Sequence, residues 1–297
     1  MSHFVQQQHT VNAFSSSDSW VILSPIEQSI KQKIEAVGVP LKDWDIQINY
    51  GIKTGCNEAF IINTDKRNEI LANCKDEAEC KRTEELIRPI LRGRDIKRYG
   101  YVDNGLYLIN THNGVRGRIP RIKIEDYPAV KAHLDQYWDR IATRADKGDT
   151  PYNLRNCAYL EDFSRPKIIW KRIGSILRFS FDNKGCLGLD STCFAAGEHI
   201  EYLCCVLNSL MGHYLLKDSP KTGTGDLLVS VQAIEPARIP YNAQYDRLLS
   251  SLLGIQIANP SNATEKEIND IVFTMYGLSL NEREYVTQYV KLSQQSL

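Results

Sequence analysis

A short glycine-flanked loop carries side chains that could bind a charged ligand. Gly51 and Gly55 enclose Lys53 and Thr54 at the tip of this loop. Glycine has no Cβ, so the backbone here can approach another molecule closely. An ammonium group and a hydroxyl can both donate hydrogen bonds to phosphate oxygens. The loop is therefore a candidate element for contacting phosphate.

A second stretch is strongly basic. Between positions 88 and 98, five residues are Lys or Arg and only Asp95 is acidic. The wider window 88–123 holds nine basic residues against two acidic ones, although the formal net charge of the chain is zero. A neutral protein can present one basic face to a negative partner. An ordinary solvated surface explains the same charges, and both interpretations stay open.

Two more loops combine glycine with basic residues. The loop at 111–121 suits a phosphate backbone, and a mobile exposed loop is the alternative interpretation. The loop at 219–225 lacks the G-x-x-x-x-G-K-[ST] order of nucleotide-binding loops, so nucleotide binding is rejected. The full set of candidate contact residues is Lys53, Thr54, Asn57, Arg92, Arg94, Lys97, Arg98, Arg116, Arg118, Arg121, Lys171, Arg172, Lys221 and Thr222.

The elements that position these residues follow from apolar periodicity and turn signals. Strands are predicted at 45–50, 57–62 and 166–170, with hairpins at 99–109 and 175–189. Helices are predicted at 24–38, 76–87, 126–141, 199–217, 242–257, 265–276 and 280–292, with a short one near 64. Three capping boxes support them: Ser24 with Glu27, Thr264 with Glu267, and Ser279 with Glu282.

This pattern predicts an α+β fold: a twisted mixed β-sheet flanked by helices, with a helical C-terminal extension. We expect a tail and linker helix at 1–44, a recognition domain at 45–240 and the helical extension at 241–297. The first nineteen residues are polar and are predicted to form a tail.

Bulk composition narrows the class of protein. The 297 residues are 42% hydrophobic and 24% charged, which is typical of a soluble globular protein. No apolar run is long enough for a membrane span and no secretory signal is visible, so no membrane partner is expected. Eight irregularly spaced cysteines without a C-x-x-C pair indicate reduced thiols in a cytoplasm, and no metal site is expected.

Two motifs resemble a known family. G-I-x-T-G-x-N-x-A-F-I-I at 51–62, followed by L-I-x-P-x-L-R-G-R-D-I-x-R-Y at 86–99, resembles the opening of the TaqI-like C-terminal specificity domain. That domain is the target-recognition part of adenine-specific DNA methyltransferases, including type IIG restriction-modification enzymes. Segments similar to the family recur at 152–155, 190–192, 207–209 and 276–278, although Asn153 departs from the small residue usual there. The resemblance covers the chain from about Trp20 to the C-terminus.

The resemblance implies sequence-specific recognition of double-stranded DNA, with the fourteen candidate residues as DNA contacts. It also implies that an N6-adenine methyltransferase part lies upstream in the same polypeptide, in the cytoplasm of a prokaryote. S-adenosylmethionine, and Mg²⁺ if the parent enzyme also cleaves DNA, would bind to that part, and no cofactor is expected in this chain. The sequence has no Pro-Pro dipeptide and no F-x-G-x-G motif, so we expect no catalytic residue and no methyl transfer by this chain alone.

Two other function classes remain open at this level. The basic loops would also suit a protein-interaction scaffold that binds an acidic partner subunit. A cysteine enzyme built on Cys56 is the third possibility, but the sequence places no basic residue beside that thiol.

Overall fold

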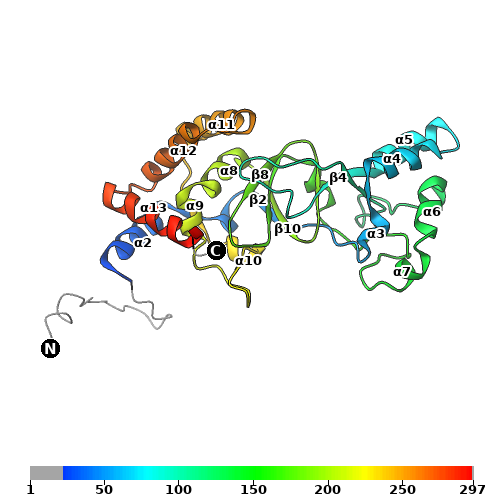
Figure 1. Ribbon diagram of the computed structural model, residues 1–297, viewed down its shortest axis with the longest axis horizontal. Coiled ribbons are helices and arrows are strands. Elements are labelled where there is room, and N and C mark those ends of the chain that lie inside the picture. The colour runs from blue at the N-terminus through cyan, green and yellow to red at the C-terminus, as the bar shows by residue number, and fades with distance from the viewer. Residues whose placement is uncertain (1–22, 296–297) are drawn as a thin grey trace.

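The computed structural model describes residues 23–295 and shows an elongated α+β molecule (Figure 1). C-terminal helices occupy one end, a second group of helices occupies the other, and β-sheets lie between them. The α+β prediction is confirmed, with the strands divided between two main sheets. The predicted polar tail at 1–19 lies outside the described residues.

The first sheet is antiparallel, and its strand order is β2-β10-β6-β8. Its strands are β2 (Ile46–Tyr50), β6 (Lys167–Lys171), β8 (Phe179–Asp182) and β10 (Thr192–Gly197). Cys193 pairs with both Tyr50 and Trp170, and Trp170 pairs with Phe179. The last residues of β2 and β6 therefore lie level with the first residues of β8 and β10. We call this end of the sheet the Tyr50 end.

The second sheet is mixed, and its strand order is β3-β5-β4-β9. Its strands are β3 (Ile61–Asn63), β4 (Ile87–Leu91), β5 (Leu106–Ile109) and β9 (Leu187–Gly188), and only the β4–β9 pair is parallel. Two small ribbons pair β1 (Val39–Pro40) with β12 (Arg238–Ile239) and β7 (Ile173–Gly174) with β11 (Leu227–Leu228).

Two groups of helices enclose the sheets. On the first sheet, α8 packs against β6 and β8, and the C-terminal helices α11 and α12 pack on α8. This group is α2 (Pro25–Val37), α8 (Ile200–Asn208), α9 (Leu210–Leu215), α10 (Val231–Ile234), α11 (Ala243–Ala258), α12 (Asn262–Met275) and α13 (Leu280–Gln295). The group around the second sheet is α3 (Asn57–Phe60), α4 (Thr64–Ala72), α5 (Glu77–Leu86), α6 (Pro128–Asp135) and α7 (Trp138–Thr143). Short 3₁₀ turns are η1 (Leu41–Asp43), η2 (Ile124–Asp126) and η3 (Leu160–Ser164).

Strand β10 is buried on both faces and separates two hydrophobic cores. Cys193 and Ala195 point into the core beneath α8, whereas Phe194 and Ala196 point into the core of the second sheet. Successive side chains of a strand point to opposite faces, which explains this division. The first sheet therefore lies between the two cores, so the molecule is not built as two separate domains joined by a linker.

The chain passes from the second sheet to the first through residues 188–192, which we call the crossing segment. The Gly51 amide donates to the Thr192 carbonyl at 3.0 Å, and the Ile52 amide donates to the Gly188 carbonyl at 2.6 Å. The glycine loop therefore begins directly against the crossing segment.

The basic stretch reaches the same place from the other side. The amide of Leu189 donates to the Leu91 carbonyl at 3.0 Å, and the Gly93 amide donates to the Ser191 hydroxyl at 3.2 Å. The two sequence motifs, far apart along the chain, thus meet on one segment at the Tyr50 end.

Several local predictions are confirmed. The three C-terminal helices form, and so do the capping boxes of Ser24 with Glu27 and of Ser279 with Glu282. The third capping box was wrong: Ser261 caps α12 through the Thr264 amide, so this helix begins earlier than predicted.

Both predicted hairpins were wrong. Residues 99–102 lie beside β8 instead of pairing with β5, because the Tyr99 amide donates to the Phe179 carbonyl and the Tyr101 hydroxyl donates to Asp182. Strand β9 pairs with β4 in the second sheet instead of with β8. The Asp182 carboxylate accepts the amides of residues 184 and 186, which turns the chain away from β8.

Two long predicted helices are divided, and one predicted strand starts late. Ser209 takes an extended conformation and caps α9 through the Gly212 amide, so residues 199–217 form two helices. Tyr137 leaves the helical conformation between α6 and α7, and its ring packs on His133 with centroids 5.4 Å apart. Residues 57–60 form one helical turn, so only the end of the predicted strand at 57–62 is extended.

The close approach at Gly51 generates a first prediction. A Cβ at this position would lie 2.0 Å from the Leu189 carbonyl oxygen, so the crossing segment would have to move. We expect Gly51→Ala to lower the free energy of unfolding by about 3 kcal/mol or more in a urea titration. Gly254→Ala is the control, because a Cβ there meets no atom within 4 Å and alanine favours helix α11 by about 1 kcal/mol. An unchanged urea midpoint for Gly51→Ala would contradict this packing.

Glu282 generates a second prediction, on acid stability. Its carboxylate accepts hydrogen bonds from Ser29 at 2.7 Å, Lys33 at 2.6 Å and the Ser279 amide at 2.7 Å, which fixes α2 to α13. Burial acts to raise the pKa of Glu282, but these hydrogen bonds outweigh it and lower the pKa from 4.5 to about 2. The stabilisation is therefore present above pH 4.5 and is lost as the pH falls toward 2.

Unfolding measured from pH 7 downward tests this linkage. Glu282→Gln should be less stable than the parent protein by about 2–3 kcal/mol at pH 7, and the difference should shrink as the pH falls below the unfolded-state pKa. Glu284→Gln, an exposed substitution on the same helix, serves as the control. Parallel pH curves for the parent and Glu282→Gln would rule out the linkage.

Candidate nucleic-acid interface

A buried arginine connects the glycine loop to a neighbouring segment of the chain by hydrogen bonds. Arg144 is 7% exposed, and burial lowers its pKa to about 10. Its guanidinium donates to four backbone oxygens, those of Thr54, Asp146, Pro151 and Asn153. The loop conformation therefore depends on a cation that the sequence analysis did not single out.

The loop itself exposes less than its sequence suggested. The Thr54 side chain is 1% exposed, and its hydroxyl donates to the Asn57 amide oxygen at 2.5 Å and accepts from the Cys56 amide at 3.2 Å. Lys53 is half exposed, but its ammonium lies 2.9 Å from the Asp146 carboxylate. Thr54 and Asn57 thus shape the loop, and the charge of Lys53 is partly neutralised within the protein.

The loop at 111–121 is also largely neutralised. Arg118 lies 2.7 Å from Glu161, and Arg121 lies 3.2 Å from Asp149. A cavity of about 630 Å³ opens between this loop and residues 156–158. Arg116 is exposed on its rim and has no ion-pair partner among residues 23–295.

Two arginines of the basic stretch are committed to internal contacts. Arg92 makes two hydrogen bonds of 2.9 Å to the Asp95 carboxylate. Burial acts to raise the pKa of Asp95, but these hydrogen bonds outweigh it and the pKa is lowered overall. Arg98 donates to the Asn208 carbonyl at 2.5 Å and pairs with Glu265 of α12. These internal contacts fix the basic stretch to the fold, and a role of either residue in contacting DNA stays a prediction.

The remaining cations gather at the Tyr50 end. Arg94 and Lys97 are exposed, and the Lys97 ammonium donates to the Arg94 carbonyl at 3.3 Å. Lys171, exposed at the end of β6, has its Cγ 2.9 Å from the point where Gly93 would carry a Cβ. Arg178, which the sequence analysis missed, is exposed immediately before β8.

Arg178 belongs with this group because the basic stretch runs along β8. The Lys97 amide donates to the Ser180 hydroxyl at 3.1 Å, and the Tyr99 amide donates to the Phe179 carbonyl at 2.9 Å. The sequence analysis placed Arg178 inside the predicted hairpin at 175–189, where no sequence signal marked it as a contact residue. We call Arg94, Lys97, Lys171 and Arg178 the basic band. Within the described part of the chain, none of the four has an acidic partner.

The neighbouring Arg172 and Lys221 differ in how far their side chains are exposed to solvent. Arg172 is half buried, and its Nε is enclosed without a hydrogen-bond partner in the described range. Lys221 is exposed on the segment that leads into the β7–β11 ribbon, and Thr222 shares a hydrogen bond of 2.8 Å with Thr224 at the tip. Lys221 is thus the accessible cation of the two.

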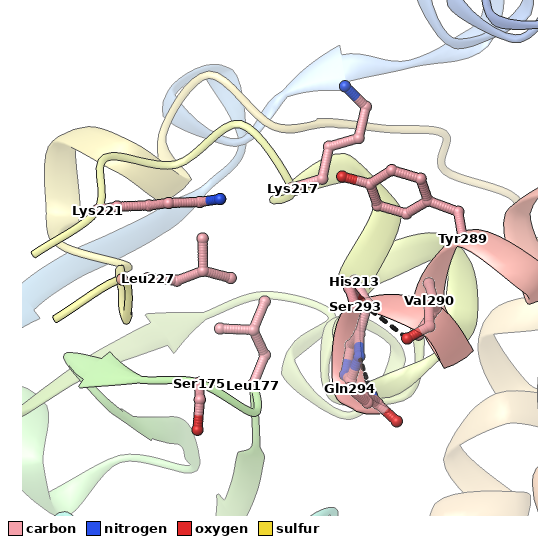
Figure 2. Close-up of a pocket in the computed structure, with 11 residues that line it drawn as sticks. Ser175, Leu177, His213, Lys217, Lys221, Leu227, Tyr289, Val290, Ser293 and Gln294 are labelled. Carbon is pink, nitrogen blue, oxygen red and sulfur yellow. Dashed lines mark hydrogen bonds between the residues drawn. The ribbon is translucent and has the colours of Figure 1, made fainter. Parts of the chain in front are cut away.

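A cavity of about 300 Å³ lies beneath this ribbon (Figure 2). Leu177 and Leu227 form one wall, and residues of α9 and α13 form the other, including His213. The Lys221 ammonium points toward the cavity, whereas that of Lys217 points away. Burial lowers the pKa of His213 to about 4, so its ring is neutral near pH 7, and its Nδ1 shares a hydrogen bond of 3.2 Å with the Gln294 side chain.

The surroundings of Cys56 do not support the cysteine-enzyme alternative. Cys56 is 5% exposed, and the hydrogen-bond partner of its thiol is the Glu58 carboxylate at 3.9 Å. Between residues 23 and 295, no three His, Cys, Asp or Glu side chains are grouped to hold a metal ion. In the same range no helix has both the length and the apolar character needed to cross a bilayer.

Comparison with known proteins supports the fold. No protein-family model and no curated protein matches the chain. Among solved structures, the type IIL restriction-modification enzyme MmeI in complex with DNA matches 88% of this chain with a TM-score of 0.59 and 11% identity. The type IIG restriction endonuclease BpuSI matches 86% with a TM-score of 0.41 and 13% identity.

The chain spans 37% of the MmeI chain and 34% of the BpuSI chain. The similarity to MmeI shows a fold like that of part of a restriction-modification enzyme, and at this identity it shows the fold alone. The narrower resemblance to a TaqI-like specificity domain stays a prediction.

Arg144 generates a third prediction. Arg144→Met would leave four backbone oxygens without their buried donor, so we expect a loss of about 3–5 kcal/mol in the free energy of unfolding. Arg140→Met is the matched control, since Arg140 is exposed and pairs only with the exposed Glu58; it should cost less than about 1 kcal/mol. Equal losses in chemical denaturation would show that Arg144 does not organise the loop.

Proposed function

We propose that this chain recognises a specific sequence in double-stranded DNA. In this proposal it is the specificity part of an N6-adenine DNA methyltransferase or of a fused restriction-modification enzyme. The observation that carries the proposal is the basic band, four exposed cations without acidic partners at the end where both motifs meet. The fold similarity to an enzyme solved in complex with DNA supports it.

The distribution of ion pairs explains why this end should face DNA. Lys53, Arg118 and Arg121 each lie within 3.2 Å of a carboxylate, so their charges contribute little net potential. The cations of the basic band keep their full charge on a molecule whose formal net charge is zero. DNA phosphates release condensed counterions when such cations bind, and this is the main sequence-independent source of affinity.

The chemistry of the parent enzyme belongs to this proposal as well. The chain spans 37% of the MmeI chain, and in this proposal a catalytic part belongs to the same polypeptide. S-adenosylmethionine would bind there, as would Mg²⁺ if the parent enzyme cleaves DNA. In this proposal the enzyme acts in the cytoplasm of a prokaryote.

The fourth prediction tests DNA binding directly. A labelled duplex titrated at low and at moderate salt should bind, and the affinity should fall as salt rises. Arg94→Ala and Lys171→Ala should each weaken binding to all sequences and reduce the salt slope by about 1. Lys53→Ala should have a smaller effect, because Lys53 is already paired with Asp146.

Arg118→Ala is the matched control, since it removes an exposed arginine whose charge Glu161 already balances. No duplex binding at low salt would reject the proposal. In that case an acidic protein partner would be the remaining explanation of the basic band. The protein-interaction scaffold would then become the favoured function.

A further inference from the structure

The connection between β6 and β8 presents an unusual pair of exposed side chains. Ile176 is 39% exposed and Arg178 is exposed, whereas Leu177 between them is buried and Phe179 is fully buried. This alternation places Ile176 and Arg178 together on the outer surface of the connection. An exposed isoleucine beside an unpaired arginine does not suit a surface that binds phosphates only.

The fold fixes both ends of this connection. The Phe179 amide donates to the Asn208 side chain at 3.1 Å, and the Asn208 side chain donates back to the Phe179 carbonyl at 2.6 Å. On the other side, β7 pairs with β11, and Leu177 and Leu227 lie on the same wall of the cavity beneath (Figure 2). Base recognition requires such support, because small displacements break paired hydrogen bonds.

The connection also lies directly beside the cations suited to phosphate. The Lys171 Cδ is 3.7 Å from the point where Gly174, within the connection, would carry a Cβ. A two-stranded ribbon such as β7–β11 fits the major groove, which is about 12 Å wide. With Lys171 and Arg94 on phosphates at the groove edge, the neighbouring connection would face the base edges.

The chemistry of the two side chains matches base edges. A guanidinium donates two parallel hydrogen bonds to O6 and N7 of guanine, and an apolar side chain packs against the methyl group of thymine. Lysine cannot reproduce the paired geometry of the guanidinium although it carries the same charge.

We propose that residues 172–178 are a base-reading element that enters the major groove. Arg178 recognises a guanine, and Ile176 contacts the methyl group of a thymine close to it. This inference rests on the proposed DNA-binding function and adds to it the residues that determine specificity.

Selection from a pool of randomised duplexes, followed by sequencing, provides the fifth prediction. The parent protein should enrich a sequence with guanine at one fixed position. Arg178→Lys should reduce the preference for that guanine by about 5- to 140-fold, while the other positions and the salt dependence stay unchanged. Ile176→Ala should weaken a thymine preference near the same position only.

Arg247→Lys on α11 is the matched control, because Arg247 is also an exposed arginine without an ion-pair partner in the described range. It should leave the guanine position as it is. If Arg178→Lys keeps the parent sequence preference, or weakens all sequences equally, the base-reading role is refuted while the proposed function stands. If the parent protein enriches no sequence and binds no duplex, the proposed function fails and the inference fails with it.

Discussion

The rest of the structure depends on the close contact of three backbones at the crossing segment. A Cβ at Gly51 would lie 2.0 Å from the Leu189 carbonyl oxygen, and one at Gly188 would lie 2.5 Å from the Thr192 hydroxyl oxygen. No side chain larger than hydrogen fits at either glycine without moving this segment. The first glycine of the loop therefore allows the protein to approach itself, where the sequence had suggested approach to a ligand. The same contact brings both motifs to the Tyr50 end.

A buried ion pair determines how the chain reaches that contact. The Lys167 ammonium lies 2.5 Å from the Asp182 carboxylate, and both side chains are fully buried. Burial acts to raise the pKa of Asp182, but Lys167 and the hydrogen bond from Tyr101 lower it overall. Burying two charges costs desolvation, so such a pair is a weak source of net stability. Here it directs the chain after β8 away from a hairpin and into β9 of the second sheet.

Local signals in the sequence predicted the parts of the fold that local chemistry decides. The C-terminal helices follow from apolar periodicity, and Ser279 with Glu282 lie three positions apart. The first hairpin failed because Tyr101 bonds to Asp182, which is remote in the sequence. The second failed because Asp182 accepts the amides of residues 184 and 186 and turns the chain away from β8. The candidate site shows the same limit. The sequence located the basic residues but not their ion pairs. Arg118 pairs with Glu161, 43 positions further along the chain, and no local pattern predicts that ion pair. Arg178 was missed because a single arginine before a strand carries no distinctive pattern.

The net charge of this chain bears on how much DNA affinity it and the other parts of a parent enzyme would each supply. A protein with zero formal net charge gains little general attraction to DNA. Its sequence-independent affinity must then come from local groups of unpaired cations, such as Arg94, Lys97 and Lys171 at the Tyr50 end. A weak sequence-independent term favours discrimination, because specificity is the ratio of specific to non-specific binding. In the proposed function, the catalytic part of the polypeptide would supply further affinity, so that this chain can remain selective without binding tightly alone.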